Sequence, residues 1–223
     1  MKLFVNGSEN RLKEFREKIG DIKGVDYYMY DFNPDAFDFN GYDAIFDLNL
    51  DEAPENLEWY ARLENKPVIV SAVKMQLAQM AYFQGNDIAC HLAGFNALPT
   101  FINRSKAELS LYNPSAKEAI TGVFNTLNWD ARFVADRVGM VTPRLVFMII
   151  NEAFYTLQEG TASMGDIDES MKLGVNYPHG PFEWCDKTGI IDVYETLAAL
   201  YDDTHDERYK ICPLLKTAYL KAG

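Results

Sequence analysis

Short apolar runs alternate with amphipathic stretches through the first half of the chain, and this alternation limits the available folds most strongly. The run Pro67–Val70 is almost continuously apolar and β-branched, as suits a parallel strand covered on both faces. Similar runs predict strands at residues 2–6, 25–31, 43–49, 67–70, 87–94 and 107–111. Helical periodicity predicts helices between them, at 12–19, 57–63 and 74–83. This order favours a doubly wound α/β layer.

From Pro114 onward the pattern changes to long helical periods. Helices are predicted at 116–127, 131–138, 143–157, 163–173, 181–188, 191–201 and 213–221, with no substantial strand among them. We therefore expect an α/β plus all-α protein. A truncated doubly wound, Rossmann-like parallel-sheet domain would occupy residues 1–113, and an all-helical domain residues 114–223.

The predicted helix at 143–157 is apolar almost all round, with Leu145–Ile150 as an unbroken apolar run. A helix of this kind has to be buried. Part of that burial can come from a second subunit, which predicts a homodimer through the helical domain. The alternative is a central helix within a monomeric bundle.

The composition is that of an ordinary globular protein and argues against several classes of partner. The chain has 21 basic and 33 acidic residues, a net charge of −12. Such a surface repels phosphate backbones and anionic lipid, so we expect no nucleic-acid and no membrane partner. Three cysteines and three histidines are too few for a disulfide framework or a metal cluster. With no signal-peptide pattern at the first residues, we expect a reduced, cytoplasmic protein without a metal.

A long ordered set of residues stands in the second half. It runs Gly165-Asp166-Ile167-Asp168 … Met171-Lys172-Leu173-Gly174 … Tyr177-Pro178-His179-Gly180-Pro181-Phe182-Glu183 … Asp186 … Gly189. Taken alone, it predicts a helix that Ser163 caps and Gly174 ends, followed by a rigid proline turn around Gly180. The set also resembles the C-terminal signature of 3-hydroxyacyl-CoA dehydrogenases. The family's entry into its first long helix resembles Gly139-Met140-Val141 and Arg144-Leu145. The resemblance implies an all-helical, dimerising domain over most of residues 115–223.

The same resemblance implies a chemistry, hydride transfer from a 3-hydroxyacyl-CoA to NAD. Family members use a histidine general base oriented by a glutamate. At the matching positions this chain has Asn96 and Glu108, twelve residues apart. A carboxamide cannot accept a proton near pH 7, so general-base catalysis worth about 10²–10⁴-fold is not available from Asn96. His91 is a poor substitute, because an odd offset of five along a strand points it to the opposite face.

Two further positions are candidates for substrate binding by this resemblance. The family's asparagine–arginine pair at the start of the long helix corresponds to Pro143-Arg144, which retains the arginine only. The family's hydroxyl-bearing turn corresponds to Ser71-Ala72-Val73-Lys74, with Lys74 at the expected catalytic hydroxyl. Ser71 and Arg144 are therefore the predicted substrate-binding residues. The alternative for Ser71 is a plain serine at the end of a strand.

The predicted cofactor site has lost most of its motif. A dinucleotide fold uses G-x-G-x-x-G so that the backbone can approach the pyrophosphate at a helix N-terminus. Here the segment is Gly7-Ser8-Glu9-Asn10-Arg11-Leu12, in which Gly7 alone remains. A carboxylate at Glu9, about 4 Å from a phosphate at an effective dielectric of about 20, opposes binding by about 4 kcal/mol. Asp31 stands where a ribose-binding acid is expected, or is a turn residue. We expect either no cofactor or weak NAD binding.

Three functions stay open at this point. The first is a divergent 3-hydroxyacyl-CoA dehydrogenase relative whose activity is lost or much reduced and which binds a small acyl or thioester ligand. The second is an active NAD(P)-dependent oxidoreductase with relocated catalytic groups. The third is a structural or regulatory dimer partner.

Overall fold

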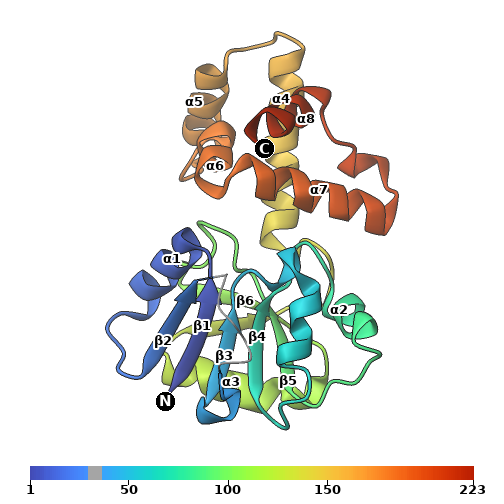
Figure 1. Cartoon of the computed structure of the whole chain (residues 1–223). Coiled ribbons are helices and arrows are strands. Elements are labelled where there is room, and N and C mark those ends of the chain that lie inside the picture. The colour runs from blue at the N-terminus through green and yellow to red at the C-terminus, as the bar shows by residue number, and fades with distance from the viewer. Residues whose placement is uncertain (30–36) are drawn as a thin grey trace. The chain divides into compact units, whose positions relative to one another are not determined.

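The computed structural model describes residues 1–29 and 37–223, which form the two compact units Met1–Met140 and Val141–Gly223 (Figure 1). The first unit contains a sheet and the second consists of helices. The strands are β1 Leu3–Gly7, β2 Val25–Met29, β3 Ala44–Asp47, β4 Pro67–Ser71, β5 His91–Phe95, β6 Lys106–Leu111 and β7 Asp130–Phe133. The helices of this unit are α1 Glu9–Ile19, α2 Leu77–Phe83 and α3 Lys117–Thr126, with 3-10 turns at 39–41, 50–52, 54–59 and 114–116.

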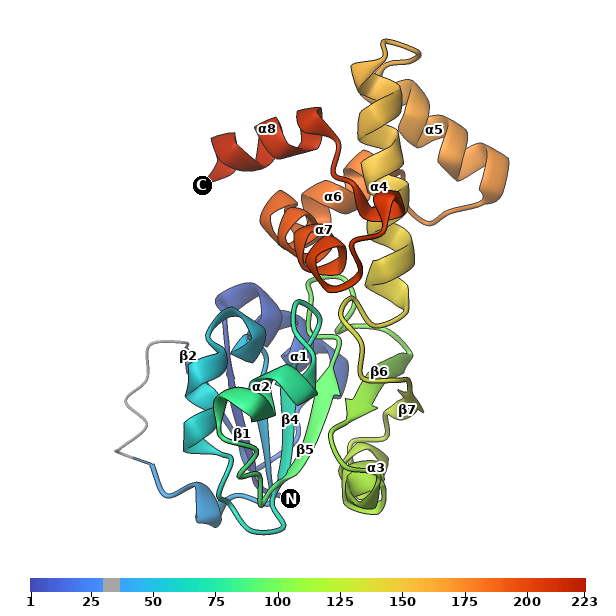
Figure 2. The same ribbon diagram turned by 90° about the vertical axis from the view of Figure 1, so that its right-hand side faces the viewer.

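The sheet has the strand order β2-β1-β3-β4-β5-β6-β7, and every neighbouring pair is parallel except β5 and β6. Both faces are covered, and Figure 2 shows the unit from a second side. On one face Val5 and Phe46 pack with Phe15 of α1 and Phe124 of α3 in one buried cluster. On the other face the ring of Phe4 stacks on Tyr28 and makes edge-to-face contacts with Phe39 and Tyr42. The predicted doubly wound α/β class is confirmed.

The helix predicted at 131–138 is wrong, because strand β7 begins this segment. β7 pairs in parallel with β6, through Ala107 opposite Ala131 and Leu109 opposite Phe133. Ala131 and Phe133 pack on the core, and the polar Asp130 and Arg132 alternate with them. This alternation has the period of two that is typical of a strand, but four residues are too few to make it evident in the sequence.

The boundary between the units also differs from the predicted one at residues 113–114. The first unit continues to Met140 because α3 packs on the sheet and β7 extends it. The change from alternating to helical periodicity therefore precedes the structural boundary.

The second unit is built around α4 Thr142–Gln158, which contacts α6, α7 and α8. The helices beside it are α5 Met164–Val175, α6 Pro181–Thr188, α7 Ile190–Thr204 and α8 Pro213–Ala222, with a 3-10 turn at 207–209. On α4 the side chains of Val146, Phe147 and Ile150 are buried, but Leu145 remains 59% exposed. The helices of this unit therefore leave part of α4 uncovered. In the described ranges we find no helix with the length and apolar character needed to cross a bilayer.

Candidate active site

The carboxyl ends of β1 and β3 form the topological switch point of the sheet. β1 lies between β2 and β3, so the chain leaves it toward one side and returns on the other. Open α/β sheets bind ligands in the crevice outside the carboxyl ends of their strands at such a point. Gly7 at the end of β1 and the residues after Asp47 of β3 therefore line the place where a dinucleotide would be expected.

Side chains of the unit itself join the two walls of this crevice. The Ser8 backbone N–H donates to Asn49 Oδ1 at 2.7 Å. Arg11 donates through Nη1 to the Leu48 carbonyl at 2.5 Å and through Nη2 to Glu52 Oε1 at 2.6 Å. Asn49 Nδ2 in turn donates to Glu52 Oε2 at 2.8 Å. The first turn of α1 is therefore tied directly to the loop after β3.

The predicted cofactor residues do not fit a dinucleotide. A Cβ at Gly7 would lie 3.1 Å from Leu48 Cβ. The absence of a side chain at Gly7 therefore lets the loop after β3 pack directly against the end of β1. Glu9 is exposed on the first turn of α1, where a phosphate would need a positive environment. Asp31, the predicted ribose-binding acid, lies outside the described residues.

A buried carboxyl group lies beneath this crevice. Asp47 Oδ2 accepts hydrogen bonds from Asn6 Nδ2 and from the Tyr60 hydroxyl, both at 3.1 Å. Burial raises the pKa of Asp47 to about 6, and hydrogen bonds from Asn6, the Asn49 backbone and Tyr60 oppose that rise. The carboxyl end of β3 is thus a closed internal polar network.

Asn96 and Glu108, the predicted dyad positions, lie together at the carboxyl end of β5. The Asn96 backbone N–H donates to the Glu108 carbonyl at 3.1 Å, and Asn96 Nδ2 donates to Glu108 Oε2 at 3.2 Å. Because a carboxylate only accepts hydrogen bonds, this contact assigns the amide nitrogen to the Glu108 side and Oδ1 to the other. Asn96 is 2% exposed, and its Oδ1 has no hydrogen-bond partner among the described residues. The catalytic role of the pair stays a prediction.

Ser71 and His91 stand at opposite ends of the neighbouring strands. Ser71 ends β4 and pairs with Phe95, one residue before Asn96. Its Oγ is buried and has no hydrogen-bond partner within the ranges described. His91 begins β5 and pairs with Pro67, the first residue of β4. His91 therefore lies at the amino end of the sheet, away from the Asn96–Glu108 pair.

In the helical unit, the signature residues hold α5 against α6. Asp168 of α5 is buried, and its two carboxylate oxygens accept from the backbone N–H groups of Phe182 at 2.8 Å and Glu183 at 3.1 Å. Lys172 forms an ion pair with Glu183, which also accepts from the Gly180 N–H at 3.2 Å. The residues of the signature therefore cap the first turn of α6 and join it to α5.

Comparison with known proteins identifies the helical unit. Residues 139–222 match the family described as 3-hydroxyacyl-CoA dehydrogenase, C-terminal domain. The helical unit is therefore similar to the C-terminal domain of 3-hydroxyacyl-CoA dehydrogenases. A 3-hydroxyadipyl-CoA dehydrogenase from Escherichia coli K12 is 46% identical over 91 residues, 40% of this chain and 19% of that protein. A probable 3-hydroxybutyryl-CoA dehydrogenase from Bacillus subtilis is 41% identical over 90 residues, 40% of this chain and 31% of that protein.

The matched segments thus span less than a third of those two relatives. Solved structures extend the likeness to the fold of both units. An (S)-3-hydroxybutyryl-CoA dehydrogenase from Ralstonia eutropha is similar over 99% of this chain and 94% of its own, with a TM-score of 0.75 and 19% identity. A 3-hydroxybutyryl-CoA dehydrogenase from Escherichia coli K12 covers 69% of this chain and 31% of its own, with a TM-score of 0.59 and 28% identity.

Arg144, the predicted substrate-binding arginine, belongs to α4 of the dehydrogenase-like helical unit. Its Nη1 donates to the Tyr209 hydroxyl at 2.8 Å, and the guanidinium lies 5.6 Å from the centre of the Tyr209 ring. These contacts connect the start of α4 to the turn before α8. Its role toward a substrate stays a prediction.

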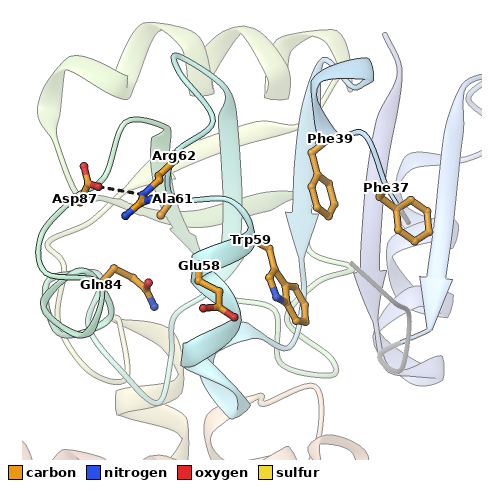
Figure 3. Close-up of a pocket in the computed structure, with 8 residues that line it drawn as sticks. All are labelled: Phe37, Phe39, Glu58, Trp59, Ala61, Arg62, Gln84 and Asp87. Carbon is orange, nitrogen blue, oxygen red and sulfur yellow. Dashed lines mark hydrogen bonds and ion pairs between the residues drawn. The ribbon is translucent and has the colours of Figure 1, made fainter. Parts of the chain in front are cut away.

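A separate cavity of about 580 Å³ lies in the sheet unit (Figure 3). It is lined by Phe37, Phe39, Glu58, Trp59, Ala61, Arg62, Gln84 and Asp87. Arg62 Nε donates to Asp87 Oδ2 at 3.1 Å across an exposed part of the lining, as Figure 3 shows. No predicted site residue within the described ranges lines this cavity.

The crevice contacts of Arg11, Asn49 and Glu52 were missed by sequence reasoning. One signal was present, because Arg11 precedes Leu12 and Phe15 on the buried side of α1. A charged residue inside an apolar stripe indicates a buried ion pair. Its partners lie 37 and 41 residues away, beyond any local pattern.

Proposed function

We propose that this chain is a 3-hydroxyacyl-CoA dehydrogenase relative in which hydride transfer is lost or much reduced, and which binds a small acyl or thioester ligand. The observation that carries the proposal is the carboxamide of Asn96, which donates to Glu108 Oε2 at 3.2 Å where the family resemblance implies a histidine. The relatives named above support the substrate class, since their names state 3-hydroxyacyl-CoA derivatives.

The loss follows from the proton balance of the reaction. When a 3-hydroxyl group is oxidised, hydride leaves C3 and the hydroxyl proton has to pass to a base. The side-chain amide of Asn96 is not basic near neutral pH, so it cannot take this proton. Its nitrogen already donates a hydrogen bond to Glu108 Oε2. Of the chain's histidines, only His91 belongs to the sheet unit, and it lies at the amino end of β5. Lys74, at the expected hydroxyl position, lies with Nζ 3.7 Å from Glu52.

Ligand binding is supported by polar atoms that the described residues leave unsatisfied. Asn96 Oδ1 and Ser71 Oγ are buried without a hydrogen-bond partner in that part of the chain. Native structures usually satisfy such atoms with protein, water or ligand. A hydroxyl or amide donor on an acyl group would satisfy Asn96 Oδ1.

We expect the full chain to oxidise 3-hydroxybutyryl-CoA with NAD at least about 10²-fold more slowly than a functional relative assayed beside it, since the general base is missing. The measurement follows the nicotinamide absorbance band in both directions, with acetoacetyl-CoA and NADH for the reverse reaction.

Glu108→Gln is the matched variant for this assay. With the dehydrogenase activity lost, the substitution should leave any residual rate unchanged. Turnover at the rate of the functional relative, reduced by Glu108→Gln, would instead establish the active enzyme with relocated groups. Ligand binding is measured by titrating the chain with acetoacetyl-CoA in a calorimeter, with free CoA as the control. A binding heat no larger than that of free CoA would refute acyl binding.

We further propose that the helical unit forms a homodimer. The exposed Leu145 on α4 supports this, together with Leu173 and Leu220, which are 78% and 66% exposed on α5 and α8. We expect sedimentation equilibrium at micromolar concentration to give twice the mass of 25.4 kDa. A monomer mass across that concentration range would contradict the dimer.

A further inference from the structure

We infer that the dinucleotide crevice of this chain is held shut by its own Ser8–Asn49 and Arg11–Glu52 contacts. The inference goes beyond the proposed function. A chain that lacks a general base could still bind a nicotinamide dinucleotide without turning it over.

The first argument concerns the backbone donors. A pyrophosphate at this point of the fold requires free N–H groups at the start of the helix after β1. In this chain the Ser8 N–H donates at 2.7 Å to Asn49 Oδ1. The amide nitrogen of the same side chain, Asn49 Nδ2, donates at 2.8 Å to Glu52 Oε2. A carboxamide oxygen thus takes a position that a phosphate oxygen would need. Binding would have to break both hydrogen bonds.

The second argument concerns charge. Arg11 is 2% exposed and directs its guanidinium to Leu48 O and Glu52, so it offers no cation to the crevice. Asp51 lies 3.9 Å from Arg11 Nη1, and Lys74 Nζ lies 3.7 Å from Glu52. Two cations therefore face two carboxylates, and the network is already neutral. Glu9, exposed on the first turn of α1, then adds negative charge where a diphosphate would lie.

The third argument concerns space. Leu48 is fully buried and Asn49 is 3% exposed, directly against the end of β1. Even a single methyl group on Gly7 would come within 3.1 Å of Leu48 Cβ and 3.4 Å of Asn49 Oδ1. In a dinucleotide site the glycine leaves room for the pyrophosphate, whereas here the chain's own loop takes that room.

The test is a titration of the full chain with NADH, without any acyl-CoA, followed by nicotinamide fluorescence. We expect no saturable binding to the natural sequence at millimolar NADH. The double variant Glu9→Gly/Asn49→Ala releases the Ser8 N–H and removes the like charge, and should bind NADH about tenfold more tightly or better. Asn10→Ala, an exposed change on the same turn, is the matched control and should behave as the natural sequence.

Saturable NADH binding by the natural sequence would overturn the inference. It would also be overturned if the double variant failed to gain binding, or if Asn10→Ala gained as much. Hydrogen exchange at the Ser8 amide of the natural chain gives a second measurement that needs no variant. Protection should be present without ligand and unchanged by NADH. Binding without turnover would refute this inference alone and leave the proposed loss of catalysis intact.

Discussion

Gly180→Ala is expected to destabilise the helical unit by about 3 kcal/mol, because the new methyl group has no space. A Cβ at this position would lie 2.3 Å from both Cβ and Cγ of Asp168. That carboxylate caps α6 through Phe182 N and Glu183 N, so it cannot retreat without losing both hydrogen bonds. For a unit of this size the melting temperature should fall by roughly 12–24 °C. Thermal unfolding of the full chain by circular dichroism gives the measurement.

Gly174→Ala is the matched control in the same unit. Gly174 lies within α5, and a Cβ there would meet no atom within 4 Å. Since alanine favours a helix more than glycine, this variant should be equal to the natural chain or more stable by up to about 1 kcal/mol. Equal melting temperatures for the two variants would show that Asp168 does not occupy the position described.

The helical unit was well predicted because its boundaries depend on local residues. α6 has the predicted bounds of Pro181 and Thr188, since a proline begins it and Gly189 ends it. At α5, Ser163 accepts from the Asp166 N–H and caps the helix as predicted. The predicted end at Gly174 is wrong, because the helix runs to Val175 and Asn176 adopts the left-handed conformation at its C-cap. Signals of this kind operate within three or four residues and need no knowledge of the fold.

The sheet unit shows where local signals fail. β7 has only four residues. It is a strand because it pairs with β6, Lys106–Leu111, and the paired residues lie more than 20 positions apart in the sequence. The apolar residues Ala131 and Phe133 followed by Val134 suit a helix as well as a strand. Their position beside β6 decides between the two, and no window of local sequence contains that information.

The candidate site divides in the same way. The family resemblance put Asn96 and Glu108 at one site, and the antiparallel pairing of β5 with β6 brings these residues, twelve apart, into contact. Their catalytic role stays a prediction. The Ser8–Asn49 contact joins residues 41 apart across parallel strands. The loss of the glycine motif is visible in the sequence, but the contacts that the end of β1 makes with the loop after β3 are not.

Arg11→Ala is expected to destabilise the sheet unit by about 3–5 kcal/mol, because it leaves buried carboxylate charge without its cation. The Asp51 side chain is fully buried 3.9 Å from Arg11 Nη1, and Glu52 accepts from Nη2 at 2.6 Å. The variant also removes the donor to the Leu48 carbonyl and opens a cavity. Urea unfolding measures the change, with the exposed Lys13→Ala on the same helix as control, expected within about 0.5 kcal/mol of the natural chain. Equal loss in both variants would mean that Arg11 is hydrated rather than enclosed, and that the crevice beside α1 is open.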